Sequence, residues 1–316
     1  MTSSAVIVVA VIVVVMAALV SAAYRRDLRR AQLALHGAKR MITGTGPIEY
    51  AECGEGMAVL SIHGAGGGFD QGLANTAAFL GSGYRIVAPS RSGYLGTPLA
   101  PGDDPDGEAS AHAALLAHLE IESAVVIGAS AGARSALDLT ILHPNRVRAL
   151  VLVVPATLSP DDLVAIDPSP ASALAFRVVN IGGDFLWWAG SRLAPLRLLR
   201  FLGVDPAVFA RVGPLEQARA LRMLRELLPL SRRVHGINRD SRPDLRERDL
   251  AAIRAPTLIV AAEDDLFNTL PAARHLARAI PQAELIVYPA GGHLLLGCDF
   301  EPIRDFVGRS GRGPRD

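Results

Sequence analysis

The stretch Ala124-Val125-Val126-Ile127-Gly128-Ala129-Ser130-Ala131-Gly132-Ala133 decides the fold. Its first half is apolar and β-branched, which predicts a buried strand, and the composition of 134–142 predicts a helix. Between them, Gly128, Ser130 and Gly132 form a Gly-x-Ser-x-Gly pattern. Between a strand and a helix, this pattern is typical of a nucleophile elbow, a sharp turn that exposes the serine hydroxyl. Because so short a pattern also arises by chance, the remaining sequence has to support it.

Outside this stretch, short apolar runs alternate with helical segments. Such alternation predicts an α/β fold with a mainly parallel sheet and helices on both faces. The expected strands are 48–56, 58–62, 84–89, 124–129, 148–154, 257–261 and 284–288, and the expected helices around them are 108–119, 134–142, 272–280 and 300–307.

The alternation stops between 158 and 250, where we expect an inserted helical cap and no strand. Trp187 and Trp188 in this cap indicate apolar core more than a platform for substrate. Arg219, Arg222 and Arg225 recur at helical spacing, which favours a solvated face, with contact to anionic lipid headgroups as the alternative. The expected cap helices are 171–180, 184–192, 194–202 and 216–228.

The N-terminus predicts a single-pass membrane anchor. Between Ala5 and Ala23 only Ser21 is polar, a length close to the ~20 residues of a bilayer-spanning helix. Tyr24 follows where an interfacial aromatic residue is expected, and four arginines come next: Arg25, Arg26, Arg29 and Arg30. The lipid bilayer is then a partner, and the positive-inside rule places the globular part in the cytoplasm.

A cleaved secretory signal is the alternative, with Ser21-Ala22-Ala23 as the cleavage site and a secreted or periplasmic globular part. Against it, the first four residues carry no basic side chain, and the apolar run exceeds the ~7–15 residues usual in such signals. The predicted organisation begins with an anchor (or signal peptide) over 1–24 and a basic linker, helical in part, over 25–46. The first part of the α/β core follows over 47–157, then the cap over 158–250, the second part of the core over 251–308 and a tail over 309–316.

Two more motifs follow strands near the C-terminus. The run 256–265 is a buried strand that ends in Glu263, Asp264 and Asp265, and Ala290-Gly291-Gly292-His293 follows the last strand. A serine, an acid and a histidine in this order match the triad order of the α/β-hydrolase fold. With a His63-Gly64 loop upstream, the chain resembles that superfamily from about 48 to 307, and in particular its capped serine hydrolases, which include esterases and carbon–carbon-bond hydrolases.

The resemblance implies roles for individual residues. Ser130 is the nucleophile, His293 the base, and Asp265 the acid that fixes the imidazole, with Asp264 as the alternative acid. Ala131 and Ala65 donate backbone N–H groups to the oxyanion. The fallback for Ala65 as an oxyanion donor is Gly66, and minor alternatives for the acid are Asp161 and Asp162.

Composition limits the other classes of function. The net charge of +1 gives no reason to expect nucleic acid, and the two cysteines, Cys53 and Cys298, show no metal-binding or disulfide spacing. The glycine run 64–68 lacks the ending of a phosphate-binding P-loop. We therefore expect no metal and no organic cofactor. His63 is expected to brace its loop, and the remaining histidines are expected on the linker, on helix surfaces and in the cap: His36, His112, His118, His143, His235 and His275.

Together these features predict a serine hydrolase that cleaves a largely apolar ester or related carbonyl substrate through an acyl-enzyme on Ser130. An acyltransferase or a cofactor-free perhydrolase of the same fold shares every one of these motifs. A non-catalytic, ligand-binding member of the fold is the third alternative, although a binder has no need of a complete triad. Neither the substrate's identity nor the oligomeric state follows from the sequence.

Overall fold

The computed structural model describes residues 3–100, 102, 104–158 and 177–311. An eight-stranded sheet forms its centre, in the order β1-β2-β4-β3-β5-β6-β7-β8. The strands from β3 to β8 pair in parallel, and β1 and β2 are antiparallel, so the predicted mainly parallel sheet is confirmed. The strands are β1 (Lys39–Thr43), β2 (Gly46–Cys53), β3 (Met57–Ile62), β4 (Tyr84–Pro89), β5 (Ala124–Ala129), β6 (Val147–Val153), β7 (Thr257–Ala262) and β8 (Glu284–Tyr288).

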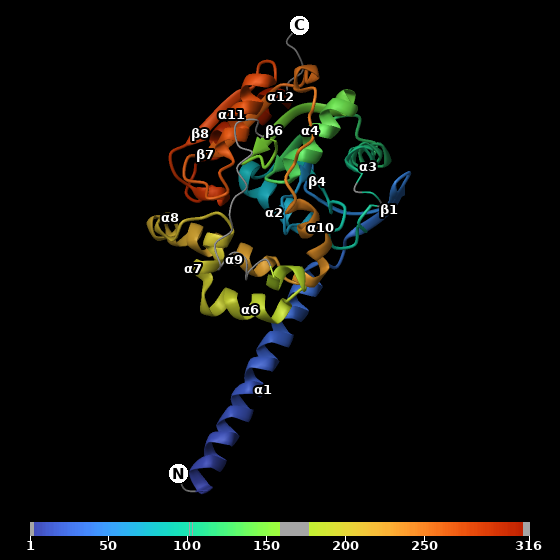
Figure 1. The fold of residues 1–316 in the computed structure, drawn as a ribbon. Coiled ribbons are helices and arrows are strands. Elements are labelled where there is room, and N and C mark those ends of the chain that lie inside the picture. The colour runs from blue at the N-terminus through green and yellow to red at the C-terminus, as the bar shows by residue number, and fades with distance from the viewer. Residues whose placement is uncertain (1–2, 101, 103, 159–176, 312–316) are drawn as a thin grey trace.

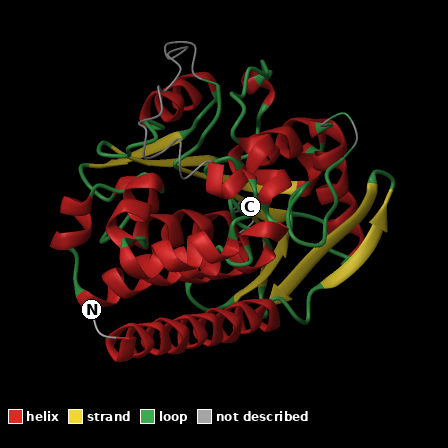
Figure 2. Cartoon of the chain, turned by 60° about the horizontal axis from the view of Figure 1, so that its bottom comes forward, coloured by secondary structure: helices red, strands yellow, loops and turns green. Residues whose placement is uncertain are grey.

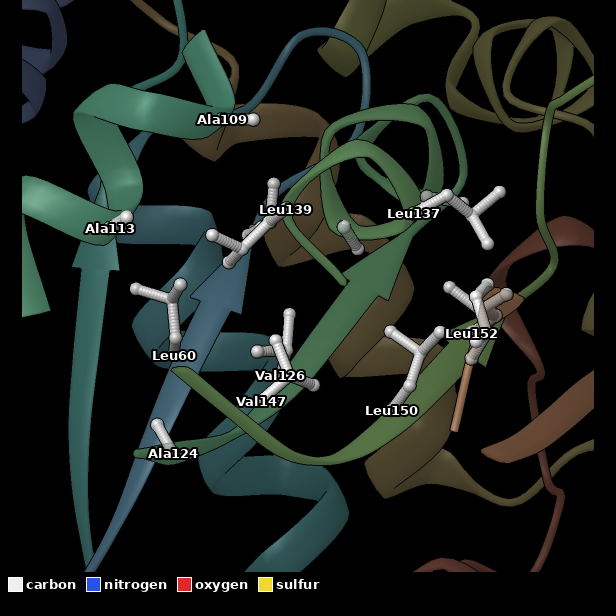
Figure 3. Packing of buried hydrophobic residues seen from close by; sticks show 14 of the residues in the cluster. Leu60, Ala109, Ala113, Ala124, Val126, Leu137, Leu139, Val147, Leu150 and Leu152 are labelled. Carbon is white, nitrogen blue, oxygen red and sulfur yellow. The ribbon is translucent and has the colours of Figure 1, made fainter. Parts of the chain in front are cut away.

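Helices cover both faces of this sheet (Figure 1). One face packs against α3 (Pro105–His118), α4 (Gly132–Leu142) and α11 (Leu270–Ala279), and the other against α2 (Phe69–Leu80) and α12 (Glu301–Gly311). Successive side chains of a strand point to opposite faces, so Val126 of β5 joins the first core and Val125 the second. Figure 3 shows Val126 and Leu150 on the sheet beneath Leu137 and Leu139 of α4. Each fully buried Val or Leu stabilises the fold by ~1.5–3 kcal/mol. The two cores, one on each face of the sheet, therefore fix the strands and the positions of their ends.

Between β6 and β7 the chain forms a group of helices that we call the helical insertion: α6 (Asp184–Leu193), α7 (Pro195–Phe201), α8 (Pro206–Arg211), α9 (Pro214–Glu226) and α10 (Val234–Asp240). Trp187, Leu199 and Leu224 form part of its buried core. No strand occurs within 177–250, in agreement with the expectation for this region. The helix expected over 171–180 falls mostly outside the described residues, which include only its end.

The N-terminal helix is longer than expected. α1 (Ser3–Ala34) runs without a break through residues that the sequence assigns to a linker, and β1 occupies five more of them. The range 25–46, expected as a linker that is helical in part, thus contains the second part of α1 and the strand β1. β1 pairs with β2 as a hairpin at the edge of the sheet, visible at the right of Figure 2, where Lys39 forms an ion pair with Glu52 at 2.7 Å. The sequence does not predict β1, because an edge strand buries little apolar surface and can therefore contain polar residues.

The first part of α1 projects away from the globular part (Figure 1). The helix is long and apolar enough to cross a bilayer, and none of its most apolar window is buried in the protein. Its second half does pack: Tyr24 and Ala31 lie against the core of the helical insertion. Leu35, the residue after α1, belongs to a buried cluster with Phe69 of α2. α1 is therefore both a candidate membrane segment and, from about Ala23 onward, a part of the folded body.

Candidate active site

Ser130 lies in the turn between β5 and α4, where its backbone adopts a φ of 50°. Positive φ is uncommon for a residue other than glycine, so the turn is strained. Two glycines make it possible. A Cβ at Gly128 would lie 2.6 Å from Cβ of Ala136, and a Cβ at Gly132 would lie 2.4 Å from the carbonyl oxygen of His63. Strand and helix therefore approach closely, and Ser130 lines a cavity at the end of the sheet.

His293 follows β8 and lies between Ser130 and Asp265. Its Nε2 is 2.9 Å from Oγ of Ser130, and its Nδ1 is 2.8 Å from Oδ2 of Asp265. The ring of Phe267 packs edge-on against the imidazole, with the ring centroids 4.6 Å apart. The backbone N–H of His293 donates to the carbonyl oxygen of Gly203, which belongs to the helical insertion. Core and insertion together thus hold the imidazole in a single orientation.

Asp265 is the carboxylate on this histidine. It also accepts hydrogen bonds from the hydroxyl of Thr269 and from the backbone N–H of Phe267, the latter at 2.9 Å. Burial opposes ionisation of this carboxyl, but His293 and the other two donors outweigh it and hold its pKa below the ordinary value. Asp265 is therefore ionised at neutral pH and directs the Nδ1–H of His293 toward itself, which leaves Nε2 as the acceptor for the Ser130 hydroxyl.

The neighbouring Asp264 has a different position. Its carboxylate accepts the backbone N–H groups of Gly291 at 3.2 Å and Gly292 at 2.7 Å, so it fixes the loop that carries His293. The preference for Asp265 over Asp264 thus agrees with the geometry. The lesser alternatives, Asp161 and Asp162, lie outside the described residues.

Ala65 and Ala131, whose backbone N–H groups are the expected oxyanion donors, line the cavity together with Ser130. Within the described residues, neither donates a hydrogen bond to a protein acceptor, whereas the N–H of Gly66 donates to the Tyr94 hydroxyl at 3.4 Å. Ala131 also precedes the first turn of α4, where the helix dipole favours negative charge. The N–H of Gly66 is thus already engaged, whereas that of Ala65 has no protein acceptor among the described residues.

His63 braces the loop that carries Ala65. Its Nδ1–H donates to the carbonyl of Gly64 at 2.7 Å, and its Nε2 accepts the backbone N–H of Arg91 at 2.9 Å. Burial, together with the positive charge of Arg91, lowers the pKa of His63 to about 3, so the ring is neutral at physiological pH. Both nitrogens are committed to the backbone, and His63 has no free position for proton transfer.

The cavity above Ser130 has a volume of about 530 Å³. Most of the wall surface is apolar, and on the side of the insertion it includes Trp187, Phe201 and Leu227. The indole N–H of Trp187 donates to the carbonyl of Leu224 at 2.8 Å, so this side chain is both insertion core and cavity wall. Trp188 instead packs away from the cavity, against α1.

Several arginines line the cavity, and the sequence does not predict this position for them. Arg219, expected on a solvated face, has only 15% of its side chain exposed, pairs with Glu216 at 2.8 Å and donates to the carbonyl of Leu294. That expectation is wrong for Arg219, although Arg222 is exposed as expected. Arg134, four residues after Ser130, lies in the wall and donates to the carbonyl of Ala156 at 2.9 Å.

A buried ionic cluster joins the core to the helical insertion. Arg91, after β4, forms two hydrogen bonds with Asp240 of α10, at 2.8 and 3.0 Å, and the Tyr94 hydroxyl donates to the same carboxylate at 2.6 Å. Burial opposes ionisation of the Asp240 carboxyl, but the charge of Arg91 and the hydrogen bonds from Arg91 and Tyr94 hold its pKa below the ordinary value. Because Tyr94 also accepts from Gly66, this cluster connects α10 to the loop beside Ser130.

One histidine lies where the sequence does not place it. His112, expected on a helix surface, is fully buried in α3, and neither ring nitrogen has a hydrogen-bond partner among the described residues. Burial lowers its pKa to about 4. The residue stands apart from the site, because it does not line the cavity.

Comparison with known proteins supports the assignment of the fold. A family model described as the alpha/beta hydrolase family matches residues 59–306. A 2-hydroxy-6-oxo-6-phenylhexa-2,4-dienoate hydrolase of Burkholderia cepacia is 26% identical over 251 residues, which cover 78% of this chain and 84% of that protein. A 2-hydroxymuconate semialdehyde hydrolase of Pseudomonas putida is 29% identical over 252 residues, covering 76% and 82%.

Solved structures agree. An alpha/beta hydrolase fold protein from Nakamurella multipartita superposes with a TM-score of 0.64 at 27% identity, covering 87% of this chain and 98% of that one. An esterase from Exiguobacterium antarcticum has the same fold, with a TM-score of 0.61 at 18% identity and coverage of 86% and 98%. The matched family region spans most of the chain and contains Ser130, Asp265 and His293. The chain belongs to the alpha/beta hydrolase family.

Proposed function

We propose that this hydrolase acts through a covalent acyl-enzyme on Ser130. The observation that carries the proposal is the hydrogen-bonded row of Ser130, His293 and Asp265 at the cavity wall, beside the N–H groups of Ala65 and Ala131. A serine hydroxyl is a weak nucleophile at neutral pH and needs an adjacent base, and the base in turn needs a group that orients it. The row supplies both.

In the first half of the reaction, Oγ of Ser130 attacks the carbonyl carbon of the substrate while its proton passes to Nε2 of His293. Asp265 stabilises the resulting imidazolium, and Ala65 and Ala131 donate to the oxyanion. Each oxyanion donor is typically worth about 10²–10³ in rate. The tetrahedral intermediate collapses, and the leaving group departs with the proton from His293. Water then repeats the sequence on the acyl carbon, which releases the acid and restores Ser130.

The cavity favours a medium-sized, largely apolar acyl group. Its volume of about 530 Å³ lies within the range of small-molecule sites, and Trp187, Phe201 and Leu227 cover it from above. We propose that the helical insertion acts as a cap, which excludes water from the reacting centre and selects the acyl chain.

A second candidate reaction is the hydrolysis of a carbon–carbon bond next to a ketone. Relatives named 2-hydroxy-6-oxo dienoate hydrolases favour it. Such a compound contains no ester, so its hydrolysis has to break a carbon–carbon bond beside the 6-oxo carbonyl. Attack by Ser130 on the 6-oxo carbon serves this reaction when the departing carbon takes the electron pair of the broken bond and the proton that His293 received from Ser130. Arg134 in the wall gives the cavity a cation that an anionic substrate would meet.

We also propose that α1 is an uncleaved membrane anchor. The candidate cleavage site, 21–23, lies inside a continuous helix, and Tyr24, the next residue, contacts Phe185 and Trp188 of the insertion. The exposed arginines after the apolar run favour a cytoplasmic catalytic domain.

The test is turnover by the purified full chain in detergent, with Ser130→Ala as the blank. Nitrophenyl esters from acetate to dodecanoate probe the first candidate, and a 2-hydroxy-6-oxo dienoate probes the second. We expect kcat/KM to rise from acetyl to medium chains, because each buried methylene contributes up to ~0.8 kcal/mol. Turnover of the dienoate alone would assign the second reaction, and turnover of neither by a folded chain would contradict both.

A further inference from the structure

The outward side of α6 is apolar although it is exposed. Phe185, Leu186 and Leu193 are 44%, 51% and 86% exposed, and Leu196 at the start of α7 is 43% exposed. On a helix, positions 185, 186 and 193 fall within an arc of about 100°, while Trp187 and Trp188 point into the protein. An apolar stripe of this kind on a surface helix marks an interaction surface.

α1 fixes where this stripe lies relative to a membrane. The ring of Tyr24, directly after the apolar run, contacts Phe185 at a centroid distance of 5.3 Å and Trp188 at 5.6 Å. Because a helix rises about 1.5 Å per residue, the run 5–23 spans roughly the ~30 Å hydrocarbon core. Tyr24 then lies at its boundary, and α6 lies at the same depth. Figure 1 shows α6 at the end of the globular part from which α1 emerges, and Figure 2 brings that end forward.

The charges around the stripe complement an anionic surface. Arg25, Arg26 and Arg197 are exposed near it, and the guanidinium of Arg192 lies over the Trp188 ring at 4.4 Å. Two carboxylates lie near the stripe. Asp27 accepts hydrogen bonds from Arg26 and Trp188 and is ion-paired with Arg192, so its charge is already compensated. Asp184, directly before Phe185, accepts hydrogen bonds from the backbone N–H and the hydroxyl of Ser231. Arginines beside an apolar helix face are the pattern of helices that lie in the headgroup region.

We propose that the outward side of α6, together with Leu196, lies in the headgroup region of the anionic bilayer that α1 spans. The proposal rests on the anchor proposed above. The inner side of the same helix carries Trp187 in the cavity wall, so one helix separates the bilayer from the catalytic cavity. The surface places the insertion where substrates dissolved in lipid are concentrated.

The test uses the full chain in nanodiscs that contain anionic lipid brominated in the acyl chains. A bimane label is placed at Leu193→Cys, in a background with Cys53→Ser and Cys298→Ser. Leu142→Cys, at the end of α4 away from the insertion, is the matched exposed control, and Val14→Cys reports the anchor itself.

Bromolipids are expected to quench the labels at positions 14 and 193, the latter by roughly twofold because the stripe is shallow, and to leave position 142 unchanged. Quenching at 14 with none at 193 would overturn the docked surface and leave the anchor intact. Loss of quenching at 14 would overturn both. In nanodiscs of neutral lipid that carries the same acyl-chain bromines, quenching at 193 is expected to weaken, and equal quenching would overturn the role of the arginines.

Discussion

At the scale of single residues, the adjacent carboxylates of Asp264 and Asp265 have different roles: Asp265 bonds His293, and Asp264 bonds the backbone of the loop that carries it. Asp265→Asn is expected to lower kcat by about 10⁴-fold, because an amide at this position stabilises the wrong imidazole tautomer. Asp264→Asn is expected to have a much smaller effect, since Asp264 holds only the backbone of Gly291 and Gly292. Steady-state kinetics of the two variants, with circular dichroism as the check on folding, measures the contrast. Equal losses would show that the assignment of the acid is wrong.

His112 predicts a dependence of stability on pH. Its folded pKa of about 4 lies below its ordinary value of 6.5, so the unfolded chain binds a proton that the folded chain does not. The stabilising contribution is fully present above about pH 6.5 and is lost as the pH falls toward 4, with a slope of up to ~1.4 kcal/mol per pH unit.

His112→Leu is therefore expected to flatten this slope. It is also expected to raise the free energy of unfolding at pH 8 by about 1–3 kcal/mol, because it removes two buried ring nitrogens that have no partner in the part of the chain that the structure describes. Urea denaturation between pH 8 and pH 5 measures both effects, and His118→Leu, on the exposed side of the same helix, is the control. An unchanged slope in His112→Leu would mean that the ring is protonated in the folded protein.

At the scale of elements, the turn between β5 and α4 depends on the absence of a side chain. A Cβ at Gly132 would meet two backbone carbonyl oxygens, at 2.4 and 2.5 Å, and backbone has little room to move away. Gly132→Ala is thus expected to destabilise the fold by about 1–3 kcal/mol and to lower activity further by shifting Ser130. Gly308→Ala in α12, where a Cβ would contact nothing, is expected to stabilise by roughly 0.5–1 kcal/mol. Thermal unfolding of both variants checks the contrast, and similar effects would contradict it.

The elements also show what sequence can and cannot predict. β5 and β7 are continuous apolar runs, and Ser130, Asp265 and His293 each follow a strand, so both the sheet and the approach of these residues could be predicted. β1 could not, because this short edge strand has no fully buried residue and only Met41 packs against the core among its five positions. Nor could the cluster of Arg91 and Asp240, because those residues lie 149 positions apart and meet only once the insertion has folded. Charge pairs of this kind carry no local pattern.

At the scale of the whole molecule, α1 has two parts with different roles. Deletion of residues 2–20 is expected to leave catalytic turnover intact and to release the protein from membranes. Deletion of residues 2–34 also removes the contacts that Tyr24 and Asp27 make with the insertion. It is expected to lower Tm by roughly 4–8 °C, which corresponds to a loss of about 2 kcal/mol in the free energy of unfolding. Fractionation, turnover and Tm of the two deletions distinguish the parts. Equal Tm values would show that the contacts of Tyr24 and Asp27 contribute nothing to stability.

The claim on which the whole account depends is that Ser130 becomes covalently modified. The direct measurement is reaction of the folded full chain with a fluorophosphonate, followed by peptide mass spectrometry. We predict one adduct per chain, on Ser130, and its loss in His293→Ala, because without its base the hydroxyl is not nucleophilic. A folded wild-type chain that stays unmodified, or one modified at another serine, would contradict the account.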